Sequence, residues 1–176
     1  MSVLIQGDQL RALLLGVRVA RGATGLTQNA ATNLFSVTGG KVVLTSLIGV
    51  VSTAIPDTAS LAIKLQHTPS GGSAGDLCGA TVIQNDSVGT IYSLVSGVAT
   101  DLLSIQSVST LKEADGTQVA ASEVPTVTFA QLLRNPIVVP AGTISALCSN
   151  HSPGSGAIVW SLTYIPYDNG AAVKAA

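Results

Sequence analysis

The sequence predicts an all-β protein, an antiparallel β-sandwich that is jelly-roll-like and carries an N-terminal arm. Three observations predict this fold class. About eight short runs rich in Val, Ile and Thr are separated by turn residues at roughly regular spacing. Some of these runs alternate strictly between apolar and polar residues, as strands with one face on a core do. Little of the chain after residue 32 has helical periodicity.

The first predicted strand covers residues 34–38 and ends at Gly39-Gly40, a tight-turn dipeptide because glycine tolerates positive φ. The third predicted strand shows the clearest alternation, with an apolar face that ends in His67. The segment Leu102 to Val108 fits a short helix or a strand, and most of residues 96–135 fits neither clearly. The predicted strands after the first are 41–55, 60–68, 76–83, 89–95, 137–139, 142–148 and 156–165.

The last predicted strand carries the strongest hydrophobic stripe. Its apolar residues recur with a period of two, which indicates one buried face. We expect this face to lie in the core, and the alternative is an interface role for Trp160 or Tyr164. The stripe consists of Ile158, Trp160, Leu162 and Tyr164.

Residues 1–32 differ from the rest of the chain. Leucines and a valine at i, i+3, i+4 and i+7 fit an amphipathic helix, whereas Leu13, Leu15, Val17 and Val19 alternate as in a strand. The sequence therefore predicts an arm and linker over 1–32, a sandwich over 33–170 and a short tail over 171–176. We expect the arm to contact a partner, or alternatively to pack on its own body as an extra helix or strand. The expected contact residues are Leu10, Arg11, Leu13, Leu14, Val17, Arg18 and Arg21.

Charged residues make up only 10% of the chain, against about 25% in ordinary soluble domains. Such a surface needs either a membrane or other protein around it. No run approaches the roughly 20 apolar residues of a spanning helix, and no basic block suggests nucleic-acid binding. The apolar stretch Ala12 to Val17 is too short for an export signal. We therefore expect a homo-oligomer, a trimer by preference, with no membrane or nucleic-acid partner.

The residues offer little for catalysis or metal binding. Ser73, between Gly71 and Gly75, matches the letters of a nucleophile elbow, but that mechanism needs a strand-to-helix turn. His67 and His151 have no patterned ligands beside them. The sequence therefore predicts no enzyme activity, cofactor or metal.

The two cysteines permit one disulfide at most. With no export signal, we expect Cys78 and Cys148 to be reduced thiols buried in strands, where they behave as small hydrophobic groups.

Five segments of the chain carry a family resemblance. They are 34–55, with Val-Thr-Gly-Gly, then 76–78, 89–93, 139–144 and 160–168, with Trp-Ser-Leu-Thr-Tyr. These segments resemble small virion proteins of tailed bacteriophages, and within that class the chain is most similar to capsid decoration (cement) proteins. The resemblance implies a protein made in the host cytoplasm that binds the major capsid protein on the assembled head, or another virion protein. A tail, baseplate or fibre component is the alternative; a carbohydrate-binding module or a hydrolase built on Ser73 fits less well.

Overall fold

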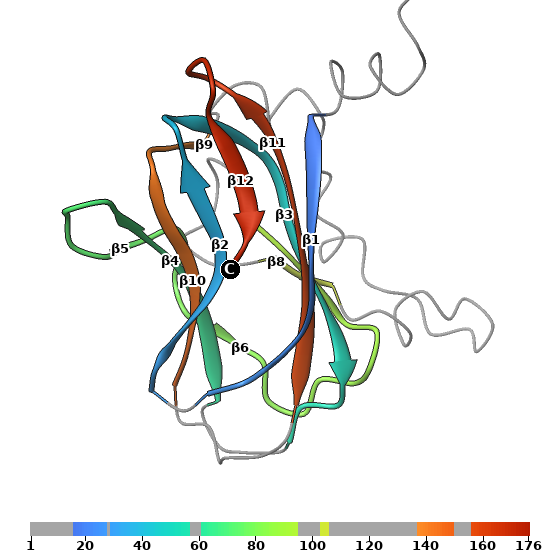
Figure 1. Cartoon of the computed structure of the whole chain (residues 1–176). Helices are drawn as coiled ribbons and strands as arrows, with labels where there is room; N and C mark the ends of the chain where they lie inside the picture. Colours follow the sequence, from blue (N-terminus) through green and yellow to red (C-terminus); the bar gives the residue numbers. More distant parts are fainter. Residues whose placement is uncertain (1–15, 28, 57–60, 95–102, 106–136, 150–155) are drawn as a thin grey trace, which may run out of the picture.

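The computed structural model is a sandwich of two six-stranded antiparallel sheets packed against each other (Figure 1). It describes residues 16–27, 29–56, 61–94, 103–105, 137–149 and 156–176, and this part of the chain contains strands and no helix. The predicted fold class, an all-β antiparallel sandwich, is confirmed.

Sheet A contains five strands in one path and a sixth beside it. The path runs β1 (Val17–Gly25), β11 (Ala157–Pro166), β3 (Val42–Thr53), β7 (Ile91–Ser93) and β8 (Leu103–Ile105), and β9 (Ile137–Val139) pairs with the first residues of β3. Sheet B runs β12 (Ala172–Ala175), β2 (Ala31–Thr38), β10 (Gly142–Ser149), β4 (Ala62–Pro69) and β5 (Gly75–Asp76), and β6 (Thr81–Val82) also pairs with β4.

The pairing is nested in the way that a jelly roll requires. Strand β1 pairs with β11, β2 with β10, β3 with β7, and β4 with β5, so early strands meet late ones. The chain therefore behaves as one long antiparallel ribbon that is rolled into two sheets. The strands β6, β8, β9 and β12 extend this eight-stranded arrangement.

The core lies between the sheets and follows the predicted alternation. The stripe on β11 is buried, with Trp160 exposed by 1% and Tyr164 by 5%, so its interpretation as core is confirmed. The apolar face at β4 is buried as well, including His67. The aromatic rings of Phe35, Tyr92 and Trp160 are the largest side chains that are fully buried.

Two glycines are required by close approaches. Gly49 lies opposite Trp160 across the β3–β11 pair, and a Cβ atom at Gly49 would sit 2.7 Å from the indole Cζ3 atom. Gly39 has φ +74°, and a Cβ there would sit 2.3 Å from the carbonyl oxygen of Gly170. Gly39 and Gly40 therefore form a corner between sheets B and A rather than a hairpin turn, packed on the connection between β11 and β12.

The predicted domain boundaries differ from the structure at both ends of the sandwich. Residues 17–25, predicted as arm and linker, form β1 on the edge of sheet A, and β2 begins at Ala31. Residues 172–175, predicted as tail, form β12 on the edge of sheet B. Residues 17–25 follow the alternative in which the arm packs on its own body as an extra strand, and the alternation at Val17 and Val19 lies within it. Polar and small residues predominate in the rest of both segments because edge strands bury little side-chain surface, which weakens their apolar period.

Two further predicted elements differ in length or number. The predicted strand 76–83 is two short strands, β5 and β6, that pair separately with β4. The sequence left a short helix or a strand open for Leu102 to Val108, and the structure has a strand, β8, at residues 103–105.

We predict that Gly49→Ala destabilises the protein by about 1–3 kcal/mol because the new methyl group would overlap the Trp160 ring in a packed core. Gly75→Ala is the matched control, since a Cβ there would meet no atom within 4 Å. It should change stability by no more than about 0.5 kcal/mol. Urea unfolding followed by Trp160 fluorescence measures both variants, and equal stabilities would contradict the packing described here.

Candidate functional site: the outer face of sheet A

The face of sheet A that points away from the core is apolar. Residues that face each other in an antiparallel pair share a face, so the partners of the buried stripe lie inward and the alternate residues point outward. At the outward positions of β1, β3, β7, β9 and β11, every apolar residue larger than alanine is β-branched. They are Val43, Ile48, Val50, Ile91, Val138, Val159 and Ile165, and together with Arg18, Ala20, Ser46, Ser93, Ser161 and Thr163 they are called the outer face of sheet A below.

Solvent reaches the apolar residues of this face. Val138 is 46% exposed, Ile165 39% and Val50 36%, and the other four are half-buried. Arg18, at the β1 margin, is the one charged side chain among the described residues of the face. The polar members are hydroxyl side chains, which can hydrogen-bond without carrying charge.

The outer face of sheet B has the opposite character. Lys64 and Asp76 form an ion pair at 3.0 Å on this side, and Gln66 donates a hydrogen bond of 2.7 Å to the same carboxylate. These hydrogen bonds, that of Gln66 first, lower the pKa of Asp76. Lys174 adds another charge beside Ser36. Of the two faces, sheet B therefore presents the charged, hydrated surface and sheet A the uncharged one.

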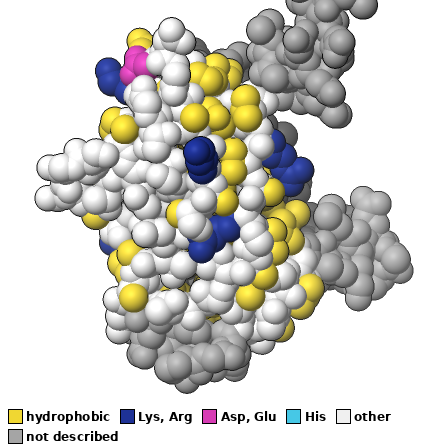
Figure 2. Space-filling view, in the orientation of Figure 1, with side chains coloured by type: hydrophobic (Ala, Val, Ile, Leu, Met, Phe, Trp, Pro, Cys, Tyr) yellow, Lys and Arg dark blue, Asp and Glu magenta, His cyan; other side chains and the backbone are white. Residues whose placement is uncertain are grey.

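The side of the sandwich that joins the two sheets is sparsely charged. Strands β1 and β12 lie together on this side, and Figure 2 shows basic side chains thinly scattered there among uncharged atoms. The guanidinium of Arg21 bridges the sheets: its Nη1 donates to the carbonyl oxygens of Leu34 at 3.2 Å and of Ala176, and its Nε donates to Thr24 at 2.9 Å.

The expected contact residues separate into two groups. Leu10, Arg11, Leu13 and Leu14 lie outside the described residues. Val17, Arg18 and Arg21 lie on β1. Val17 and Arg18 are exposed, whereas Arg21 is half-buried and hydrogen-bonded within its own chain.

The residues considered for catalysis are not brought together. His67 is buried, its Nε2 lies 3.1 Å from the carbonyl oxygen of Pro140, and burial lowers its pKa, so the neutral ring donates this hydrogen bond at pH 7. Ser73 lies in the exposed connection between β4 and β5, which projects from the sandwich without a helix (Figure 1). His151 lies outside the described residues. Within the described part, no three His, Cys, Asp or Glu side chains are grouped as metal ligands.

Asp86 and Tyr92 form a buried pair that sequence reasoning did not single out. The Tyr92 hydroxyl donates a hydrogen bond to a carboxylate oxygen of Asp86, and the two residues are exposed by 0% and 5%, respectively. Burial, and then this bond, raise the pKa of Tyr92. The backbone of Asp86 accepts a hydrogen bond from Ile55 at 2.9 Å, so the pair anchors the connection between β6 and β7 to the end of β3.

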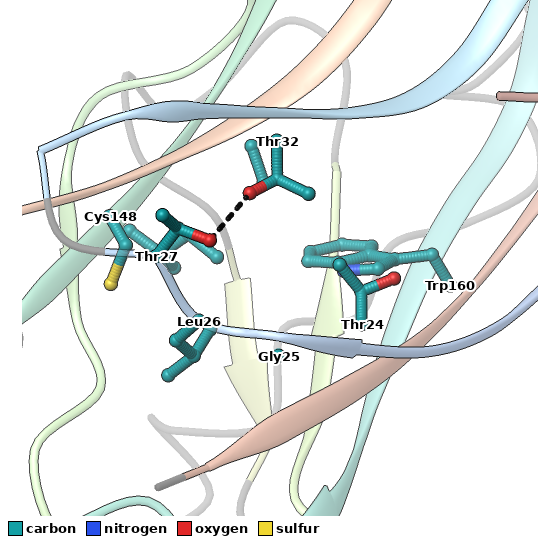
Figure 3. Close-up of a pocket in the computed structure, with 9 residues that line it drawn as sticks. Thr24, Gly25, Leu26, Thr27, Thr32, Cys148 and Trp160 are labelled. Atoms are coloured by element: carbon teal, nitrogen blue, oxygen red, sulfur yellow. Dashed lines mark hydrogen bonds between the residues drawn. The ribbon is translucent and has the colours of Figure 1, made fainter. Parts of the chain in front are cut away.

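A small hollow opens where the chain crosses from β1 to β2 (Figure 3). It is lined by Trp160 and Cys148 from the core and by threonines, of which Thr32 and Thr27 are hydrogen-bonded at 3.3 Å. The hollow has room for no more than about one water molecule, which excludes a sugar ring. Among the described aromatic residues, Tyr167 is the exposed one, so this part of the chain forms no sugar-stacking platform.

Comparisons with known proteins give no match: no family model, no curated protein and no solved structure is similar to this chain. No helix within the described residues is long and apolar enough to cross a membrane.

The sequence contains a signal for the outer face of sheet A. The predicted strands 41–55 and 156–165 place Val or Ile at many positions on both faces, which is unusual for a strand with one solvated face. The register between β3 and β11 is what shows that these residues form one continuous surface.

We predict that Arg21→Ala lowers the free energy of unfolding by about 1–2 kcal/mol because it removes the hydrogen bonds that join β1 to sheet B. Arg18→Ala, at an exposed position of the same strand, should change it by no more than about 0.5 kcal/mol. Chemical denaturation compares the two variants. If Arg21→Ala is as stable as Arg18→Ala, Arg21 is not the bridge between the sheets.

Cys78 and Cys148 are free and buried, as predicted, but Cys78 lies between β5 and β6 rather than in a strand. Its sulfur accepts a hydrogen bond from the Leu65 N–H at 3.2 Å, and burial raises the pKa of Cys148 to about 11.

We predict that the two thiols of the native protein are alkylated slowly at pH 8, because the thiolate is the reactive form, and that the chain takes two labels after denaturation without reductant. Intact mass measurement counts the labels; a denatured chain with none would reveal a disulfide.

Proposed function

We propose that this chain is a structural virion protein of a tailed bacteriophage that binds the assembled head and stabilises it as a decoration (cement) protein. The observation that carries the proposal is the outer face of sheet A, which offers seven β-branched apolar side chains and one marginal charge to a partner. Such a face is costly to leave in water and is typical of a protein that works by assembly.

Three further features support this function over an enzymatic one. A jelly roll with one continuous hydrophobic core suits a structural component whose role does not depend on a conformational change. His67 is buried with its Nε2 bonded to the Pro140 carbonyl oxygen, whereas Ser73 lies on an exposed connection, and no three His, Cys, Asp or Glu side chains of the described residues are grouped as metal ligands. Segments 34–55 and 160–168 resemble phage virion proteins. They include β3 and parts of β2 and β11, which are interior strands of the two sheets.

The arm remains part of the proposal, with its length corrected. Because β1 belongs to sheet A, an arm that reaches a neighbouring virion subunit would consist of residues before Gly16. Leu10, Leu13 and Leu14 would supply its apolar contacts and Arg11 its charge.

We predict that a chain lacking residues 1–15 folds with an unchanged melting temperature but binds heads at least about tenfold more weakly, because β1 and its pairing with β11 remain intact. A chain lacking residues 1–25 is the control for folding: it loses the edge strand and should melt at a lower temperature. Cosedimentation with purified heads of the encoding phage, stripped of this chain, measures binding.

Fractionating the same virions into heads and tails locates the native protein. Recovery with heads supports the proposal, and recovery with tails alone contradicts it. If the chain lacking residues 1–15 binds heads as tightly as the full chain, the arm has no part in the contact.

A further inference from the structure

We infer that the outer face of sheet A is the surface through which two copies of this chain pack against each other. Its three most exposed apolar residues, Val50, Val138 and Ile165, lie on three different strands, so the apolar surface extends across the sheet rather than along one edge. Side chains of this kind stabilise a contact by leaving water, not by matching a charge.

The absence of charge favours a second copy over a different protein. In a contact between identical surfaces, residue i of one copy meets residue j of the other and j meets i, and only residues near the two-fold axis meet their own counterparts. A charge near the axis would therefore face a like charge, whereas an apolar side chain there would face an apolar one. The described residues of this face carry one charge, on Arg18 at the β1 margin, away from its centre on β3. A surface shaped to recognise a different protein commonly carries complementary charges that select the partner.

The face is large enough for a stable pair. Strand β11 has 10 residues, which span about 33 Å. Four strand positions span about 19 Å at the usual spacing between strands: β1, β11 and β3 fill three of them, and the short strands β7 and β9 share most of the fourth, beside different parts of β3. The flat area is therefore about 600 Å² on each copy and about 1,200 Å² in total, above the roughly 1,000 Å² that a specific interface needs.

The edges of the sheets are poorly suited to the main alternative, in which copies join by adding strands. The β1 edge of sheet A is interrupted by a bulge between Arg21 and Thr24 and carries Arg18. In sheet B, β12 has four residues and β5 and β6 have two each. Bulges, basic side chains and short strands are the features that prevent edge-to-edge pairing. Packing of sheet against sheet, as inside the sandwich itself, remains available.

A two-fold contact of this kind uses the same surface on both copies, so it joins two copies and no more. The trimer expected from the sequence would need a second contact between two different surfaces. The inference concerns the free protein in solution and does not depend on the proposed place of the chain in a virion.

Sedimentation velocity of the full-length chain tests the inference, over about 1 to 100 µM and without any particle present. Wild-type protein should sediment as a dimer. Val50→Glu should weaken the dimer at least about 100-fold, because the two-fold axis brings buried carboxylates from both copies into one apolar contact. Val82→Glu is the matched control: it makes the same change at a valine that is 63% exposed on β6 of sheet B, and it should leave the dimer unchanged.

Circular dichroism checks that each variant is folded. Val138→Glu on β9 repeats the test at a second position of the face should Val50→Glu fail to fold. A monomeric wild type overturns the inference, as does a folded variant on this face that dimerises as tightly as Val82→Glu. A third outcome is a monomeric wild type that binds heads, together with a Val50→Glu variant that binds them less well. It would show that the face contacts the capsid and not a second copy of this chain. A wild-type protein that forms the dimer, with Val50→Glu disrupting it, but does not bind heads would leave this inference standing and contradict the proposed function.

Discussion

The register between β3 and β11 is the constraint on which the rest of this structure depends. Ten residue pairs join these central strands of sheet A, from Ala157 opposite Thr53 to Pro166 opposite Val42. The register places Trp160 over Gly49, where the missing side chain leaves room for the indole ring. A slip by one residue would turn every side chain of β11 to the other face and bring Trp160 into contact with solvent. The burial of one large ring thus helps to determine which residues face the core and which form the outer face.

The same register explains how so few charges are compatible with a folded domain. A sandwich needs one apolar face on each sheet, and hydrated outer faces usually complete it. Here only sheet B follows that rule, with Lys64, Asp76 and Lys174 on or beside its outer surface. Sheet A carries apolar side chains on both faces, and hydroxyl side chains together with Arg18 complete its outer face. The shortage of charged residues therefore shows mainly on one surface, the outer face of sheet A, and not evenly over the molecule.

Polar contacts hold strands and connections together at the side and the ends of the sandwich. Arg21 ties β1 to β2 and to the residue after β12, which joins the two sheets along one side. On the connections at either end, the Lys41 N–H donates to the Asp168 carboxylate at 2.8 Å, and Tyr92 bonds the buried carboxylate of Asp86. Each contact satisfies polar groups that the folded chain partly or fully removes from water, so losing one partner costs more than the bond itself contributes.

The sequence by itself determined the strands with a strong apolar period. The buried stripe on β11 and the alternating face at β4 follow from residue types and spacing, because burial on one side of a strand demands a period of two. Gly39 and Gly40 predicted a tight turn, and only the tertiary structure makes it a corner between the two sheets. Edge strands lack that demand. Segments 17–25 and 172–175 therefore read as linker and tail, although hydrogen bonds to β11 and β2 make them strands. No local pattern records such bonds, since every residue except proline offers the same backbone groups.

The candidate surface was decided only by the tertiary structure. Val50, Val138 and Ile165 lie on three segments separated by many residues along the chain, and nothing in their local sequence distinguishes them from core residues. They become one surface because β9 and β11 both pair with β3, and they face outward because the Trp160 stripe faces inward. A surface of this kind depends on pairings between distant strands, and long-range pairing is the property that the spacing of residues in a single sequence does not encode.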